Sequence, residues 1–187
     1  MASVKMFARA VFALLLGVAS VGAALADENM QLVEQEIKAG LLYNFLKYTQ
    51  WPDDHSPAAD GDVIVCLFGG DPFDGHLQPM SGRTVNQHAI KIRNVKGADD
   101  LSACSLVFVH ANQKADWPQL QKTLAGKDVL TVSDFDGFAA SGGMIEFIRA
   151  DNRIGIKINV DAVKAAHLAV EDRLLKLASA VHTNATD

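Results

Sequence analysis

The sequence predicts an α/β fold, a single-domain sandwich with a central, mostly buried sheet flanked by helices. Short continuous apolar runs bounded by glycine or polar residues recur along the chain, as expected of strands that are covered on both faces. Between them lie stretches whose apolar residues recur every three or four positions, the pattern of amphipathic helices. No repeat, low-complexity tract or interdomain linker interrupts residues 27–187, so we expect one domain there.

Residues 1–26 have the pattern of a cleaved signal peptide. Lys5 and Arg9 give a positive start, and no charged residue follows until Asp27. The apolar run is shorter than the roughly 20 residues that a transmembrane helix needs. It ends in Ala24-Leu25-Ala26, whose small residues suit signal peptidase. We therefore expect cleavage before Asp27 and a soluble, exported product.

The charge balance excludes two classes of partner. The formal net charge is −5, and removal of Lys5 and Arg9 with the signal makes the product more acidic. Binding to nucleic acid or to an anionic membrane depends on clustered Lys and Arg, and the sequence has no such cluster. We therefore expect no nucleic-acid partner and no membrane insertion after cleavage.

Long helices are expected at both ends of the domain. The first covers residues 30–50 and stops before Pro52, because the residue before a proline avoids the helical region. The last runs from Val160 to about Val181, with Asn159 as its N-cap. Its apolar residues follow a 3-4 spacing that suits packing on the first helix or, alternatively, on a second chain: Val160, Val163, His167, Val170, Leu174, Leu177 and Val181.

The strands are expected between these two helices. Three apolar runs predict buried strands, at residues 63–68, 105–110 and 129–132. Residues 89–95 alternate apolar and polar side chains, so they predict a strand with one wet face, and residues 144–148 and 154–158 predict a hairpin that turns at Asp151-Asn152. Shorter helices are expected around residues 73–80 and 116–124.

The only two cysteines, Cys66 and Cys104, are candidates for a disulfide. An exported chain meets an oxidising compartment, and an even cysteine count favours pairing there. Two separate buried thiols, packed as small hydrophobic side chains, are the alternative. A catalytic redox pair is not expected, because the C-x-x-C spacing is absent.

No catalytic or metal-binding pattern is present. The six histidines are scattered, without H-E-x-x-H spacing, and no G-x-S-x-G or phosphate-loop motif occurs. His110 ends a predicted strand, where active sites of open sheets often lie, but a histidine at a strand edge explains it as well. Asp134-Phe135-Asp136-Gly137 starts like a calcium loop but lacks the later ligands, so a turn is expected. We expect no enzyme, no cofactor and no metal site.

Two segments near the ends of the domain resemble a known family. Residues 44–52, Asn-Phe-Leu-Lys-Tyr-Thr-Gln-Trp-Pro, resemble the segment that opens YfiR-type domains. Residues 152–159, Asn-Arg-Ile-Gly-Ile-Lys-Ile-Asn, and then 174–178, Leu-Leu-Lys-Leu-Ala, resemble the segment that closes them. The strands and glycine breaks between these segments fall in order. The resemblance thus covers about residues 33–181 of a YfiR-like domain of residues 27–187.

This resemblance implies a periplasmic α/β protein that can form a homodimer. It implies a repressor that binds the periplasmic sensor region of an inner-membrane diguanylate cyclase, so that its release raises cyclic di-GMP and favours biofilm formation. Cys66 and Cys104 match one disulfide of the family by position. A second cysteine pair of the family falls near residues 141–143, where this chain has Ser-Gly-Gly, so a redox switch that needs that pair is not implied here.

Candidate partner contacts lie beside the apolar spacing of the closing segment. Glu171 and Arg173 flank it, and charged rims around an apolar strip set binding specificity. The alternative function is a periplasmic small-molecule binding module without a cyclase partner, which would use the loop of residues 69–75 and the strand ends.

The signal pattern generates the first prediction. Periplasmic material should have an intact mass that starts at Asp27, because Ala24 and Ala26 place the cut there. A chain that keeps Met1 and fractionates with membranes would contradict both the cleavage and the compartment.

Overall fold

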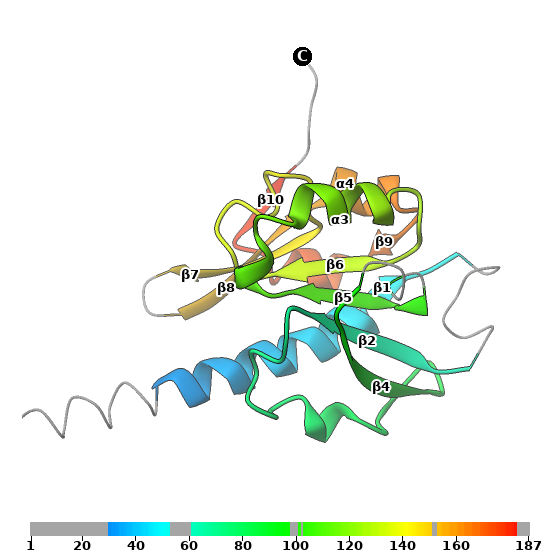
Figure 1. Cartoon of the computed structure of the whole chain (residues 1–187), viewed down its shortest axis with the longest axis vertical. Helices are drawn as coiled ribbons and strands as arrows, with labels where there is room; N and C mark the ends of the chain where they lie inside the picture. The colour runs from blue at the N-terminus through cyan, green and yellow to red at the C-terminus, as the bar shows by residue number, and fades with distance from the viewer. Residues whose placement is uncertain (1–29, 53–60, 98–100, 102, 151–152, 183–187) are drawn as a thin grey trace, which may run out of the picture. The chain divides into compact units, whose positions relative to one another are not determined.

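The computed structural model describes residues 30–52, 61–97, 101, 103–150 and 153–182 (Figure 1). The expected signal peptide and the expected turn at residues 151–152 lie outside these ranges. The chain divides into two compact units, residues 1–35 and 36–187. Of the first unit, the structure describes residues 30–35, which are helical. All that follows concerns the second unit.

Eight of the described strands form one mixed sheet, in the order β10-β8-β7-β6-β5-β2-β4-β3. The five from β7 to β4 run parallel, whereas β8 is antiparallel to β7, β10 is parallel to β8, and β3 is antiparallel to β4. The bounds are β2 Val63–Phe68, β3 Thr84–Val85, β4 His88–Val95, β5 Leu106–Val109, β6 Leu130–Ser133, β7 Ile145–Ala150, β8 Arg153–Asn159 and β10 Ala180–His182. All the predicted strands are therefore present, and the structure adds β3 and β10.

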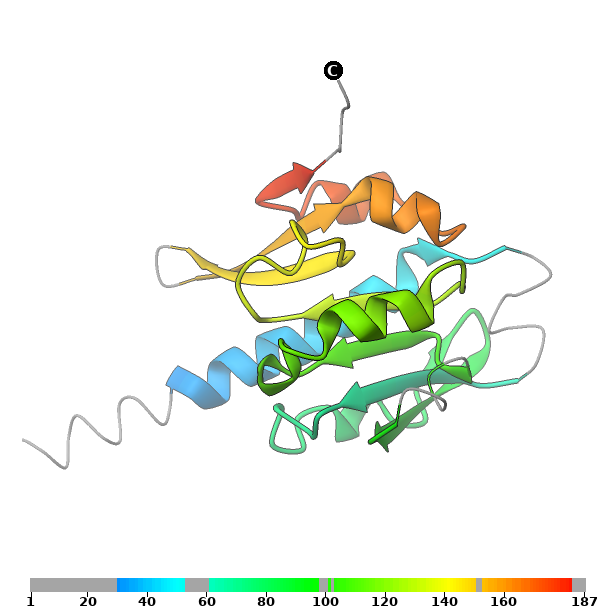
Figure 2. The same ribbon diagram turned by 45° about the horizontal axis from the view of Figure 1, so that its top comes forward.

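Each face of the sheet has its own apolar cluster. The helix of residues 36–47, called the N-terminal helix below, covers one face, where Leu42, Phe45 and Leu46 are fully buried. On the other face lies α3, Trp117–Leu124, which buries Trp117, Leu120 and Leu124. Figure 2 shows α3 in front of the central strands and the N-terminal helix behind them. These layers explain why β5 and β6 are buried at every residue and β2 at every residue except the partly buried Ile64.

Short helical turns complete the element list. The predicted helix around residues 73–80 is a series of turns that ends in the 3₁₀ helix η1, Gln78–Met80. A second 3₁₀ helix, η3, covers Ala111–Gln113. Asn86 and Gln87 both have positive φ, as a tight turn between the antiparallel strands β3 and β4 requires.

The structure does not support the expectation of long helices at both ends: the opening segment is helical to residue 47 and continues into β1, and no long closing helix forms in the described residues. The closing segment instead forms α4 (Val160–Ala165), β9 (Ala169–Val170), α5 (Asp172–Leu175) and β10. His167 adopts a left-handed φ of 55° directly after the C-cap of α4. The single helix that was expected to pack on the first helix or, alternatively, on a second chain does not form over residues 160–181, and Leu177 and Val181 are about half exposed, at 51% and 47%.

Strand pairing is the physical reason for this difference. The N-terminal helix gives way to β1, Thr49–Gln50, which pairs antiparallel with β9. At the far edge of the main sheet, β10 pairs with the end of β8. These pairings hydrogen-bond backbone groups of two segments distant in sequence, and that tertiary context overrides local helical periodicity. The N-cap prediction holds, because the Asn159 side chain accepts a 2.9 Å hydrogen bond from the Ala162 amide.

Cys66 and Cys104 form a disulfide, in agreement with the even cysteine count. Cys66 lies in β2 and Cys104 just before β5, which is paired with β2, so their Cα atoms lie only 5.9 Å apart. Both residues are buried in the cluster beneath α3. The bond therefore attaches the segment that connects β4 with β5 to strand β2 at the centre of the sheet.

The second prediction concerns this bond. On the chain-entropy estimate, a cross-link that closes a loop of 38 residues stabilises the fold by about 4 kcal/mol. Thiol labelling of the unfolded, non-reduced protein should find no free thiol, and the double variant Cys66→Ala/Cys104→Ala should lose a few kcal/mol of unfolding free energy in a denaturant titration. Two labels per chain would contradict the bond.

Candidate functional site

The carboxyl ends of β2 and β5 form the point at which the strand order reverses. From β2 the chain passes to β4 over one face, where Phe73 and Leu77 join the cluster beneath the N-terminal helix. From β5 it passes to β6 through α3 on the other face. In open α/β sheets ligands often bind in the crevice at such a point. The sequence candidates His110 and the loop of residues 69–75 meet here.

Side chains of η3 fill this crevice. His110 Nδ1 accepts a 3.0 Å hydrogen bond from the Asn112 amide, and Asn112 Nδ2 donates to the Gly69 carbonyl at 3.2 Å. A Cβ atom on Gly69, which has a φ of +97°, would lie 2.7 Å from Asn112 Oδ1 and would also overlap Gln113. His110 is therefore the cap of η3, and the Gly69 loop is packed against that element.

A buried ion pair lies at the neighbouring strand end. Lys38 Nζ, on the N-terminal helix, is 2.9 Å from Asp134 Oδ2, just after β6. The Lys38 side chain is only 7% exposed and lies 5.8 Å from the centre of the Phe147 ring. Removing one partner of such a pair leaves a desolvated charge, which destabilises a fold more than the intact pair stabilises it. Asp134 is thus a structural contact in the turn that the sequence predicts after β6.

A second buried carboxylate holds the rest of that turn. Glu146 in β7 is 1% exposed and accepts hydrogen bonds from the amides of Gly137 and Ala139, at 3.3 and 2.9 Å. Its register partner on β8, Lys157, places Nζ 3.4 Å from Oε1. Asn159 Nδ2 donates to the Ala139 carbonyl at 2.8 Å. These contacts connect residues 134–143 to the hairpin of β7 and β8.

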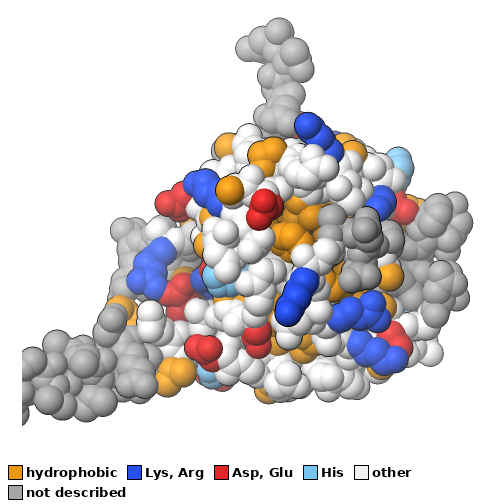
Figure 3. Space-filling model, viewed as in Figure 1, with side chains coloured by type: hydrophobic (Ala, Val, Ile, Leu, Met, Phe, Trp, Pro, Cys, Tyr) orange, Lys and Arg blue, Asp and Glu red, His pale blue; other side chains and the backbone are white. Residues whose placement is uncertain are grey.

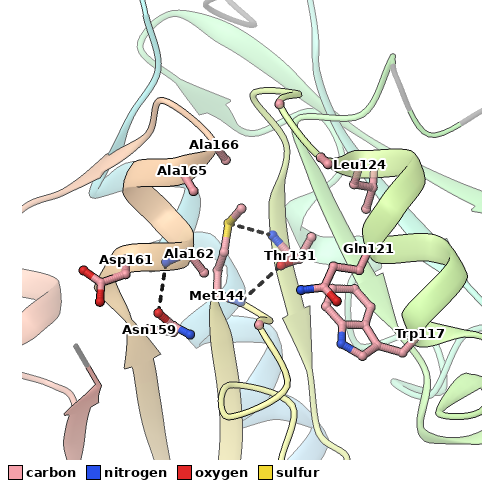
Figure 4. A pocket seen from close by; sticks show the side chains of 13 residues that line it. Trp117, Gln121, Leu124, Thr131, Met144, Asn159, Asp161, Ala162, Ala165 and Ala166 are labelled. Atoms are coloured by element: carbon pink, nitrogen blue, oxygen red, sulfur yellow. Dashed lines mark hydrogen bonds between the residues drawn. The ribbon is translucent and has the colours of Figure 1, made fainter. Parts of the chain in front are cut away.

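A cavity of about 460 Å³ lies between α3 and α4 (Figure 4). Residues of α3 and the loop after it form one wall, and α4 forms the other. The floor comes from Thr131 on β6, Met144 before β7 and Asn159 at the end of β8. The complete lining is Trp117, Gln121, Leu124, Ala125, Gly126, Thr131, Gly142, Met144, Asn159, Asp161, Ala162, Ala165 and Ala166.

The cavity has a buried floor and an exposed rim. Thr131 and Asn159 are each 2% exposed, whereas Gln121 and Ala165 are exposed. A recess of this size and largely apolar lining has the properties of a small-molecule site. Figure 3 shows apolar side chains on the molecular surface near α3, among scattered charged side chains.

The described residues contain no group of three or more His, Cys, Asp or Glu side chains that could hold a metal ion. His167, which the sequence places in an apolar seam, has a 63% exposed side chain whose Nδ1 lies 2.9 Å from Asp128 Oδ1. None of the helices in the described ranges is long and apolar enough to cross a bilayer.

The candidate partner contacts lie around α5. Glu171 is its N-cap residue, is half-buried, and donates its backbone amide to the Tyr48 carbonyl at 2.9 Å. Arg173 is exposed in the middle of α5. One turn further on lies the exposed Leu177. This segment therefore exposes one basic and one apolar side chain, although the long helix expected to carry them does not form in the described residues.

Sequence reasoning missed the cavity and the buried charges. Lys38 stands on the helix of residues 36–47 with no sequence sign that its partner follows β6. Glu146 had a signal, because a single acidic residue interrupts the apolar run Met144-Ile145-Glu146-Phe147-Ile148. The cavity had no sequence signal, because its walls come from two helices that are far apart in the sequence and whose separation is set by the sheet.

The comparison with solved structures gives a partial match. The ABC domain in complex with L-Trp from Streptococcus pneumonia superposes with a TM-score of 0.46 at 8% sequence identity. The match covers 66% of this chain and 56% of that chain. Nothing about a ligand or partner of the present protein follows from a likeness at that level.

A family match extends over most of the chain. Residues 35–179 match the YfiR/HmsC-like family. The matched range contains both segments that carry the sequence resemblance, and it contains every strand of the main sheet except β10. The chain belongs to the YfiR/HmsC-like family.

Proposed function

We propose that this protein is a periplasmic regulator that binds and represses an inner-membrane diguanylate cyclase, and so lowers cyclic di-GMP. The observation that carries this proposal is the family match over residues 35–179. The regulatory contact would be made with the periplasmic sensor region of the cyclase.

The disulfide supports the compartment. Disulfides form and persist in oxidising compartments and are rare in the reducing cytosol. The Cys66–Cys104 bond links β2 to the residue two positions before β5, and both cysteines are buried in the core. A cleavable signal peptide over residues 1–26 would deliver the chain to the periplasm.

The chemistry of the strand ends supports action by binding rather than by catalysis. His110, Asp134 and Glu146 are titratable groups at or beside the ends of β5 and β6, and each has a structural partner. His110 caps η3, Asp134 pairs with Lys38, and Glu146 holds a turn. Each of these groups therefore has a role in the fold, which favours action by binding.

The proposed contact surface is the segment of residues 171–181. It includes the exposed Arg173, the exposed apolar Leu177 four residues later, and Val181 in β10. Arginine flanking an exposed apolar group is a composition typical of protein interfaces. Glu171, which is half-buried at the start of α5, would contribute the opposite charge at the rim.

Repression requires a preference between two states of the cyclase. A ligand shifts a conformational equilibrium only by its difference in affinity for the two states. The regulator must therefore bind the inactive sensor more tightly than the active one. A charged rim such as Arg173 can supply this preference if its partner is within reach in only one state.

Deletion of the gene tests the proposed function directly. Loss of the repressor should raise cellular cyclic di-GMP and surface attachment, and re-expression of the exported chain should restore both. Unchanged cyclic di-GMP, in cells that express a diguanylate cyclase with a periplasmic sensor, would contradict the proposal.

Arg173→Glu tests the proposed surface. Because Arg173 is exposed, the substitution should change the unfolding free energy by no more than about 0.5 kcal/mol, yet it should weaken repression in the cyclic di-GMP assay. Arg93→Glu is the matched control, since Arg93 is exposed on β4, near the opposite edge of the sheet from β10. If Arg173→Glu represses as strongly as Arg93→Glu and the wild type, the contact lies elsewhere.

A further inference from the structure

We propose that the cavity between α3 and α4 binds an uncharged, largely apolar small molecule with one hydrogen-bonding group. This site shares no residue with the contact surface of residues 171–181. The proposal concerns ligand binding only and does not rest on the proposed regulatory function.

The polar atoms of the cavity floor are already paired with each other or with nearby backbone. Thr131 Oγ1 accepts from the Met144 amide at 3.2 Å, and the Thr131 amide lies 3.5 Å from the Met144 sulfur. Asn159 uses Oδ1 for the Ala162 amide and Nδ2 for the Ala139 carbonyl. An ordered water needs two to four polar partners, so this floor favours an apolar occupant over water.

The lining offers no charge to a ligand. Asp161 is the only charged residue among the lining residues, and Figure 4 shows its carboxylate directed away from the cavity, on the outer side of the first turn of α4. A charged ligand would therefore lose its hydration without gaining an ionic partner, which is costly in an apolar recess. The site selects uncharged molecules for this reason.

Gln121 supplies the polar contact. Its carboxamide points across the cavity toward Met144 and lies against Gly142, where a Cβ atom would overlap the amide nitrogen. The exposed position of Gln121 at the rim leaves its amide able to reorient, and the group offers both donors and an acceptor. A ligand hydroxyl, carbonyl or amide near the opening could pair with it.

The two walls differ in bulk. On α3, Trp117 and Leu124 present large buried side chains, and the indole N–H of Trp117 is occupied by the Ser141 carbonyl at 3.1 Å. On α4 and its C-cap, three alanines line the cavity, Ala162, Ala165 and Ala166. The short side chains of that wall create the space that a ring system would fill.

Two probes with one skeleton test the charge preference. 2-Naphthalenemethanol is neutral and has one hydroxyl, whereas 2-naphthoate carries a carboxylate at neutral pH. Titration calorimetry of the oxidised, full mature chain should show binding of the alcohol and at least about tenfold weaker binding of the carboxylate. No detectable heat with the alcohol up to its solubility limit, or tighter binding of 2-naphthoate, would overturn the proposal.

Substitutions that fill the cavity test the location. Ala162→Leu adds bulk from the α4 wall, and Ala125→Leu adds it from the loop after α3, so each should weaken binding of the alcohol about tenfold or more. The matched control is Lys164→Leu, because Lys164 is exposed on the same helix and does not line the cavity. This control should bind like the wild type.

The two filling variants keep the test decisive if one of them folds poorly. A cooperative thermal unfolding transition shows which variant is folded, and the exposed Ala125 tolerates a larger side chain without a buried clash. Binding of the alcohol that both variants retain would place its site elsewhere and overturn the proposal. Absence of probe binding by the wild type, combined with loss of repression in Ala162→Leu, would assign the cavity to a side chain of a partner protein instead.

Discussion

The backbone of β5 is hydrogen-bonded to a parallel strand on each side, β2 and β6, while its four side chains are all buried. A strand in this position must be apolar on both faces, so it requires a helical layer above and another below. The N-terminal helix and α3 are those layers. The disulfide, the η3 cap and the ion pair of Lys38 all lie around the strands that this requirement places side by side.

The central strands could be predicted from the sequence because full burial leaves an unmistakable apolar run, as in Val63–Phe68 and Leu106–Val109. The structure of the closing segment could not be predicted in this way. Its 3-4 apolar spacing is compatible with a helix, but Leu168 and Leu174 reach the core from a chain that bends at His167 and pairs through β9 and β10. The spacing of apolar residues carries no information about which strand a segment will pair with, whether that strand is β1 for β9 or β8 for β10.

The candidate site likewise has features that could be predicted from the sequence and features that could not. Cys66 and Cys104 could be paired from their number and the export signal, because only one pairing exists for two cysteines. Arg173 is exposed as expected of a flanking charge, but on a four-residue helix rather than a long one. The α3–α4 cavity depends on the spacing of two helices over three strands, and neither helix encodes that spacing by itself.

The pairing of β1 with β9 has a consequence for how the chain can acquire its structure. Thr49 lies opposite Val170, so the strand that follows the first helix cannot be completed until nearly the whole polypeptide is available. Contacts of such long sequence separation close large loops and slow folding. Until the last segment has emerged, β1 and the end of β8 expose unpaired strand edges, which are the groups most open to pairing with another chain. The chain therefore depends on residues 169–182 to cover the edges of β1 and β8, which precede them in the sequence.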